Sequence, residues 1–581
     1  MKKLISIFAL VALSMVMLCS CNDDNVVADP APETEKAEDV DYVLMHYSLG
    51  GGNLDEGILT NIMQLLDEGS NEKVKMTFEY KLSDSLQHLP QYKDFEGTRR
   101  FTADQNTHFK DKFQSLTDDY PYLDGKKTAD IVSQIKSERI GDAKYDMSCK
   151  EGLADFIKWS KQQYPNAKHM ILVISDHGGA WNLFRDGKKD TRAVLFDDNI
   201  DDTQLGAKVK DKGLSLQNLV DGVNDAGGID ALYMDACLMS TYENLYGYAQ
   251  CVKYLLASFE TVSGYGADYR ELNKLLKKAG SGEEDMVDAL KKYVDYNNSD
   301  SWWNKDWPFC TDMGLYDLSK LNKLTPILKK IADTLAEKYV SNEELELKGE
   351  EHPLGNTYAP YIRSAMNSCL VSYVRFVPTD SIPQNIASLM LEDGVRVEYE
   401  VYLHSVDVIK WLRFAPTDNA KMAYEKYPEE WAKAKKVVYD LNYTSYSLTD
   451  LMGRLYDNLV RAGLSSDDNP FDKLLSDMLD ALKDMAYIRC TKESEEEIAY
   501  LVCSPGVCLI PLNDLYYCEE NKSMVKSIPT YQEALRYYQN TEFDKQVGWS
   551  RVLQLLDVYP NAFTNTMRDF KGELQVEDEE K

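Results

Sequence analysis

Residues 170–174 read MILVI and residues 229–234 read IDALYM, and these two apolar runs decide the fold. Continuous apolar runs of this length are typical of strands buried on both faces of a parallel sheet. Stretches with helical periodicity separate them from further strand patterns, which predicts a mixed, mostly parallel α/β sheet with helices on both faces. The expected strands are 42–48, 74–80, 170–174, 229–234 and 254–258, and the expected helices are 55–66, 151–164, 214–226 and 239–248.

The pattern changes after about residue 270, where helical periodicity dominates at 285–296 and 318–339. A strand-rich, mixed stretch follows, then further helices and a last strand-like patch. The sequence therefore predicts an α/β domain over residues 41–280 and a helical and mixed C-terminal region over residues 281–581.

The N-terminus has the pattern of a targeting segment. Two lysines precede an apolar run of about 15 residues, shorter than the ~20 needed to span a bilayer. The following Leu18-Cys19-Ser20-Cys21 resembles a bacterial lipobox. That resemblance implies a signal peptide over residues 1–21, lipidation of Cys21 and a flexible tether over residues 22–40. We therefore expect an exported protein attached to a bacterial membrane through its lipid alone, at the outer membrane or cell surface.

Composition narrows the possible partners. The net charge of −31 argues against a nucleic-acid partner and favours basic ones, although such a charge also serves solubility alone. Nine of the 11 cysteines lie beyond the signal segment, and an odd number leaves at least one thiol free unless pairing is intermolecular. With only seven histidines and no paired zinc spacing, we expect no metal site of the Cys/His type.

Two short motifs directly follow the apolar runs. Ser175–Trp181 reads SDHGGAW, and Asp235–Met239 reads DACLM. Ligands bind at the carboxyl ends of strands in open α/β sheets. If the two strands are neighbours, His177 and Cys237 face one cleft.

These residue types suit nucleophilic catalysis. A thiolate is the reactive form of cysteine, and a nearby histidine can take the thiol proton. The N–H groups of Gly178 and Cys237 are the natural donors of an oxyanion hole. Taken singly, a cysteine after an apolar strand is more often a small buried hydrophobic residue, and a histidine beside two glycines is more often part of a turn.

SDHGGAW followed by MDACLM resembles the clostripain-like cysteine peptidases (peptidase family C11, in the clan of caspases, gingipains and legumain). The resemblance implies a caspase-like α/β/α sandwich. Other segments resemble the family too, namely LADFIKWSKQQY at 153–164, AVLFDDNIDDTQLGAKVKDKGLSL at 193–216, ASFETVSGYG at 257–266 and FDKQVGWSRVL at 543–553.

The resemblance implies a cysteine endopeptidase with His177 as general base and Cys237 as nucleophile. Its substrates would be proteins or peptides with basic residues, cleaved after Arg or Lys at P1. Asp235 is the first candidate to bind that side chain, with capping of the next helix as its alternative role. Asp268 is a second candidate, and for Asp176 we expect a structural role near His177 in preference to that of a third catalytic residue. The other open function is a catalytically silent lipoprotein that binds peptides or glycans through its many tyrosines.

Some features stay open on either interpretation. Ala180, Phe259 and Ala267 depart from the family pattern, and the last two bear on the shape of the substrate pocket. The chemistry requires no cofactor. The resemblance adds Ca²⁺ binding at an acidic turn and self-cleavage in a basic loop, each against the alternative of a solvated surface loop. The residues concerned are Asp197, Asp198, Asp201 and Asp202 for Ca²⁺, and Arg185, Lys188, Lys189 and Arg192 for cleavage. Residues 340–420 match the family poorly and are either an insertion or a partner-binding module.

Overall fold

A computed structural model gives the fold of the chain, and all described residues belong to one compact unit, Asp39–Lys581. The structure describes residues 39–49, 54–81, 97–109, 134–141, 145–182, 192–197, 212–259, 262, 266–298, 313–338, 445–461, 467, 469–489, 500, 505–508, 535–536 and 538–558.

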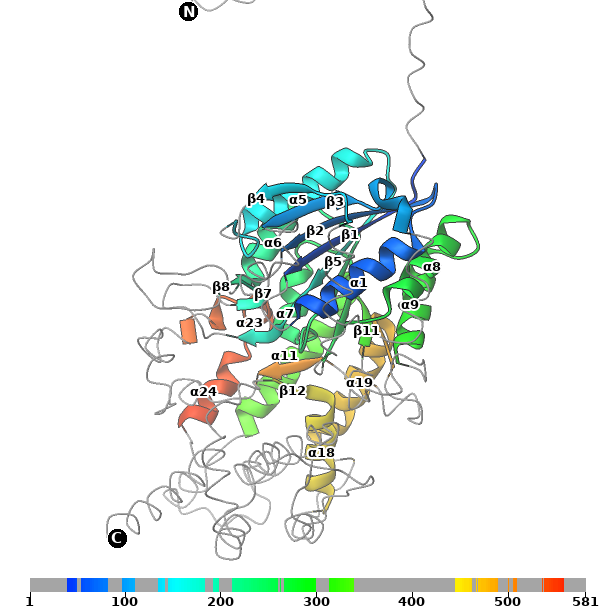
Figure 1. Cartoon of the computed structure of the whole chain (residues 1–581). Helices are drawn as coiled ribbons and strands as arrows, with labels where there is room; N and C mark the ends of the chain where they lie inside the picture. The colour runs from blue at the N-terminus through cyan, green and yellow to red at the C-terminus, as the bar shows by residue number, and fades with distance from the viewer. Residues whose placement is uncertain are drawn as a thin grey trace, which may run out of the picture. The chain divides into compact units, whose positions relative to one another are not determined.

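A nine-stranded sheet forms the centre of the unit, in the order β13-β11-β10-β9-β5-β1-β2-β3-β4 (Figure 1). The five strands from β10 to β2 run parallel, and antiparallel strands extend the sheet at both edges. The strands are β1 (Tyr42–Leu49), β2 (Val74–Lys81), β3 (Thr98–Thr102), β4 (Glu138–Gly141), β5 (His169–Ser175), β9 (Ala231–Asp235), β10 (Tyr254–Ser258), β11 (Met313–Asp317) and β13 (Ala486–Ile488).

The central strand β5 shows why the apolar runs are continuous. Successive side chains of a strand point to opposite faces. Leu172 and Ile174 join one hydrophobic core, whereas Ile171 and Val173 join the other. Both faces of the sheet are therefore buried, as the sequence predicts.

Helices cover the two faces separately. One core contains α1 (Asp55–Glu68), α8 (Tyr269–Gly280) and α9 (Met286–Asn297), which group on one side of the sheet in Figure 1. The opposite core contains α5 (Lys150–Gln163), α6 (Leu216–Asp225), α7 (Tyr242–Tyr248), α11 (Leu321–Lys338), α18 (Leu448–Arg461) and α19 (Pro470–Met485). The mixed, mostly parallel α/β/α architecture is therefore confirmed.

Two smaller sheets accompany the large one. Strands β6 (Gly178–Asn182), β7 (Arg192–Asp197) and β8 (Lys212–Ser215) pair antiparallel directly after the SDH motif. As a result the helix expected from residue 214 begins at Leu216, after β8. Strand β12 (Ser445–Ser447) pairs antiparallel with β14 (Gly506–Cys508).

The large sheet continues across the domain boundary expected at residue 280. Strands β11 and β13 come from the predicted C-terminal region, and they extend the sheet beyond β10. Helix α11 packs against α19 and against two late helices, α23 (Glu542–Val547) and α24 (Ser550–Val558). Within the described ranges, no helix is both long and apolar enough to cross a membrane.

Candidate active site

The ends of strands β5 and β9 bring the two sequence motifs together. The strands pair in parallel, and Ser175 is the register partner of Asp235. The pairing continues one residue further, because the Asp176 N–H donates to the Asp235 carbonyl oxygen over 3.4 Å. His177 and Cys237 each lie two residues beyond these partners. The strand adjacency on which the predicted pair depends is therefore confirmed.

The main chains of the two motifs approach each other at Gly178. A Cβ atom at this position would lie 2.1 Å from the Cys237 carbonyl oxygen and 2.6 Å from the Cys237 nitrogen. Both distances are far below any real carbon contact, so only glycine allows this approach. The close approach of the two main chains therefore explains why a glycine follows His177.

Three main-chain N–H groups surround the sulfur of Cys237. The Val262 N–H donates to Sγ over 3.3 Å, and backbone hydrogen bonds from Val262, Gly178 and Cys237 itself each lower the pKa of the thiol. Burial raises the pKa of the thiol and is the largest effect, and the nearby Asp235 carboxylate raises it further. The pKa of Cys237 is raised to about 11. The thiol is therefore protonated at neutral pH.

His177 is half-buried, and burial lowers its pKa below the ordinary value. Its imidazole is therefore neutral at pH 7 and can accept a proton. A protonated thiol and a neutral imidazole at adjacent strand ends can support general-base chemistry, in which the proton leaves the sulfur as the sulfur attacks.

The residue after the cysteine has an unusual backbone. Leu238 has a φ of +64°, the left-handed region that is unfavourable for a bulky side chain. Strained residues of this kind persist where surrounding contacts fix the chain, and they cluster at functional sites.

Asp235 is buried beside two hydroxyl groups. It is 4% exposed, and its Oδ2 accepts a hydrogen bond of 2.5 Å from the Tyr269 hydroxyl and one of 3.4 Å from Ser175 Oγ. Burial raises its pKa to about 6, although these bonds and one from the Ala267 main chain lower it. The proposed alternative for Asp235, capping of the next helix, is wrong, because the Thr241 side chain caps α7.

The other residues that the sequence analysis named near this site cap a helix or are buried. Asp268 is the N-cap of α8, and its carboxylate accepts hydrogen bonds from the Arg270 main chain and from the Tyr296 hydroxyl. Phe259 and Ala267, which depart from the family pattern, are both buried, as is Asp176.

Several predicted features lie outside the described residues. Among them are Cys21, the signal and tether, the region 340–420, and most of the loop between His177 and Cys237. In that loop Arg192 begins β7 and Asp197 ends it, and the remaining residues named for self-cleavage or Ca²⁺ binding are not described. Among the described side chains, no group of three or more His, Cys, Asp or Glu residues is placed to hold a metal ion.

Sequence reasoning missed Val262 and Tyr269. Val262 lies in the stretch 257–266 that resembles the family and Tyr269 follows it closely, but their contacts join residues 25 and 34 positions apart in sequence. Among the described residues, Cys149, Cys237 and Cys251 are cysteines that form no disulfide. Of these three described cysteines, only Cys237 follows a parallel strand whose neighbour leads to the histidine.

The fold and this site define a class of α/β proteins with a histidine and a cysteine on adjacent parallel strand ends. The model of the clostripain family of C11 peptidases matches residues 118–554, and the chain belongs to this family.

A curated relative, clostripain of Hathewaya histolytica, is 24% identical over 280 residues, which are 46% of this chain and 48% of the relative. The chain thus spans about half the length of that relative. Similar solved structures include a secreted C11 cysteine protease from Bacteroides thetaiotaomicron, with 13% identity, a TM-score of 0.40, and coverage of 87% of this chain and 99% of that one. An inactive zymogen C11 protease from Parabacteroides distasonis has 12% identity, a TM-score of 0.40, and coverage of 87% and 97%.

Proposed function

We propose that this chain is a cysteine endopeptidase in which Cys237 is the nucleophile and His177 the general base. The observation that carries the proposal is the register pair Ser175–Asp235, which sets the two reactive residues at equivalent positions after adjacent strands. Membership of the clostripain family supports the same chemistry.

The reaction follows from the protonation states. The His177 imidazole accepts the thiol proton as Cys237 Sγ attacks the substrate carbonyl carbon. The carbonyl oxygen becomes negative, and the N–H groups of Gly178 and Cys237 donate to it. The imidazolium then gives its proton to the leaving amine, which forms a thioester acyl-enzyme. Water, deprotonated by the same imidazole, hydrolyses the thioester and releases the thiol.

We propose a basic P1 residue, Arg or Lys, recognised through Asp235. Asp235 is a buried carboxylate two residues before the nucleophile, at the end of the strand that precedes it, and its charge suits a guanidinium or ammonium group. The net charge of −31 also favours the approach of basic peptides.

We propose further that the protein is exported and attached to the membrane through a lipid on Cys21, with no other membrane contact. Labelling with an alkyne fatty acid in the source bacterium should mark the wild-type protein and not Cys21→Ala. Equal labelling of both would exclude lipidation at this residue.

Self-cleavage near Arg185–Arg192 should convert the wild type into two chains and leave Cys237→Ala intact.

The central experiment is covalent labelling of the nucleophile. Incubation with an arginine chloromethyl ketone should place one adduct on Cys237, located by mass spectrometry, and should abolish hydrolysis of Arg and Lys amides. Cys149 and Cys251 act as internal controls, because they are cysteines of the same chain that form no disulfide. No adduct and no hydrolysis would leave the binding lipoprotein as the better account.

A further inference from the structure

Residues 237–241, which we name the nucleophile loop, are held by hydrogen bonds from parts of the chain that are distant in sequence. The Ser240 N–H donates to the Ser258 carbonyl over 3.0 Å, which ties the loop to β10. The Gly506 N–H donates to the Ser240 carbonyl over 3.0 Å, and Gly506 forms a parallel bridge with Thr241. The loop therefore lies between a central strand and β14, about 270 residues later in the chain.

Helix α7, which follows the nucleophile loop, contacts another segment from the C-terminal part of the chain. Helix α7 carries Glu243, which is fully buried, and the Tyr538 hydroxyl donates to its Oε1 over 2.7 Å. A buried carboxylate is costly without hydrogen-bond donors, so this contact fixes the start of α7. Asn244 in the same turn donates its side-chain N–H to the Met239 carbonyl over 3.2 Å, which links the helix back to the loop.

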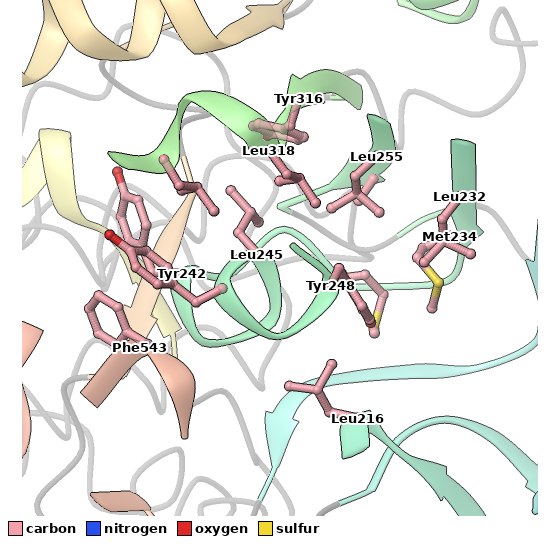
Figure 2. Packing of buried hydrophobic residues seen from close by; sticks show 14 of the residues in the cluster. Leu216, Leu232, Met234, Tyr242, Leu245, Tyr248, Leu255, Tyr316, Leu318 and Phe543 are labelled. Carbon is pink, nitrogen blue, oxygen red and sulfur yellow. The ribbon is translucent and has the colours of Figure 1, made fainter. Parts of the chain in front are cut away.

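Aromatic packing adds to this contact. Phe543 of α23 stacks on Tyr242 with ring centroids 5.9 Å apart, and it meets Tyr246 at 5.3 Å edge to face. Figure 2 shows the Phe543 ring beside Tyr242 at the end of the hydrophobic cluster. Trp549, also buried, lies 6.2 Å from Phe543. These rings place the C-terminal segment 538–549 directly on the first turns of α7.

The loop needs such support because of its own conformation. Leu238 has a φ of +64°, which is unfavourable for leucine, directly after the reactive cysteine. The contacts on both sides of Leu238, from Gly178 before it and from Ser258 and Gly506 after it, oppose relaxation of that residue.

We propose that Tyr538 and Phe543 are positioning residues for the Cys237 thiol, which act through Glu243 and the start of α7. They do not touch the substrate. They hold the nucleophile loop in its strained conformation, so that the sulfur stays near the N–H groups of Val262, Gly178 and Cys237. The C-terminal segment is thus part of the machinery that keeps the thiol in place. This inference rests on the proposed function for its effect on hydrolysis, but not for its effect on the thiol.

The first test is Tyr538→Phe, which removes one hydroxyl and keeps the ring. We expect kcat per active site to fall about tenfold with KM changed by less than about twofold, because small displacements of a reacting group reduce turnover strongly. Tyr500→Phe is the matched control. Its hydroxyl also makes a buried hydrogen bond of 2.7 Å, but to the Ala486 carbonyl at the start of β13. We expect the control to lose thermal stability and keep kcat.

Two further variants separate positioning from general destabilisation. Replacing Glu243 by Gln in the Tyr538→Phe background should restore part of kcat, because a neutral amide without the hydroxyl donor costs less than a buried carboxylate. Phe543→Leu should also lower kcat while keeping an apolar side chain in the core. If Tyr538→Phe and Tyr500→Phe lose equal stability and both keep wild-type kcat, the positioning role is excluded.

A readout that needs no peptidase activity makes the two proposals distinguishable. The rate at which iodoacetamide alkylates Cys237, followed by mass spectrometry at fixed pH, should change several-fold in Tyr538→Phe and not in Tyr500→Phe. Altered alkylation in a protein whose wild type hydrolyses no amide would support the positioning role and overturn the proposed function. If the wild type is active and Tyr538→Phe leaves both the alkylation rate and kcat unaltered, the positioning role is overturned and the proposed function stands.

Discussion

The Val262 N–H lies 3.3 Å from Cys237 Sγ and donates a hydrogen bond to it. Val262 belongs to the segment between β10 and α8, whereas Cys237 follows β9, so two successive parallel strands each deliver main chain to the same sulfur. The Val262 carbonyl also faces the sulfur, at 3.7 Å, as the acceptor of the thiol proton. This segment therefore contacts the sulfur through both a donor and an acceptor, whereas burial is what keeps the thiol protonated before substrate arrives.

The protonation state of Cys237 predicts a steep pH dependence of its reactivity. Burial raises the pKa of the thiol to about 11, and only the thiolate reacts with iodoacetamide. The alkylation rate should therefore rise about tenfold per pH unit between pH 7 and 10, measured on the Cys237 peptide. A rate that is already constant near pH 7 would indicate a preformed thiolate–imidazolium pair and would contradict the general-base mechanism.

A methyl group at residue 178 should disrupt the site. In Gly178→Ala the new Cβ would meet the Cys237 carbonyl oxygen at 2.1 Å, so one of the two main chains must move. We expect kcat/KM to fall at least about 100-fold, because a displacement of about 1 Å at a reacting centre has effects of that size.

Gly282→Ala is the control for this substitution. Its φ of +82° strains alanine too, but a Cβ there meets nothing within 4 Å. It should cost roughly 1–2 kcal/mol of stability and leave kcat unchanged. Wild-type kcat in Gly178→Ala would show that the close approach is not needed for catalysis.

The sequence predicted the central strands and the neighbouring positions of His177 and Cys237 for a clear physical reason. Strands buried on both faces need apolar residues at every position, and this pattern is visible in MILVI at 170–174. A parallel strand also delivers its following loop to one edge of the sheet. The positions of His177 and Cys237 follow from those two facts and from one pairing, that of β5 with β9.

The edge strands and the contacts of the site could not be predicted in the same way. Strands such as β3 (TRRFT) and β13 (AYI) are short or polar, and they form because an adjacent strand offers hydrogen bonds, not because of their own sequence pattern. The bonds from Val262 to Cys237 and from Tyr269 to Asp235 join residues 25 and 34 positions apart. The contact of Tyr538 with Glu243 joins residues 295 positions apart, which no local pattern records.

The chain should not fold as an α/β domain if it ends at residue 280. It would lack β11 and β13, which pair beyond β10, and helices α11 and α19, which contribute to the core on one sheet face. Leu255 and Tyr248 would then lose part of their apolar cover, and exposed surface of this kind leads to aggregation. The control is a chain that ends at residue 558, the last residue of α24. Cooperative thermal unfolding of the chain that ends at 280 would contradict this prediction.

Replacing Asp235 by Asn should stabilise the fold at neutral pH while it removes cleavage after basic residues. Burial raises the pKa of Asp235 from 3.8 to about 6. Because the folded-state pKa lies above the unfolded value, the folded protein binds this proton more tightly, and stability falls as the pH rises from about 4 to about 6. At pH 8 the ionised carboxylate therefore costs roughly 2–3 kcal/mol that a neutral amide avoids.

The measurement compares thermal unfolding of the wild type and Asp235→Asn at pH 4 and pH 8, together with KM for an Arg amide. The variant should gain stability at pH 8 and little at pH 4, and its KM for the Arg amide should rise about 100-fold, since a charged hydrogen-bonded pair contributes up to about 3 kcal/mol. In the wild type the same KM should increase as the pH falls below about 6, because protonation removes the negative charge. If Asp268→Asn instead abolishes Arg cleavage and Asp235→Asn retains it, the basic side chain is bound by Asp268, and Asp235 serves to hold Tyr269 and Ser175 in place.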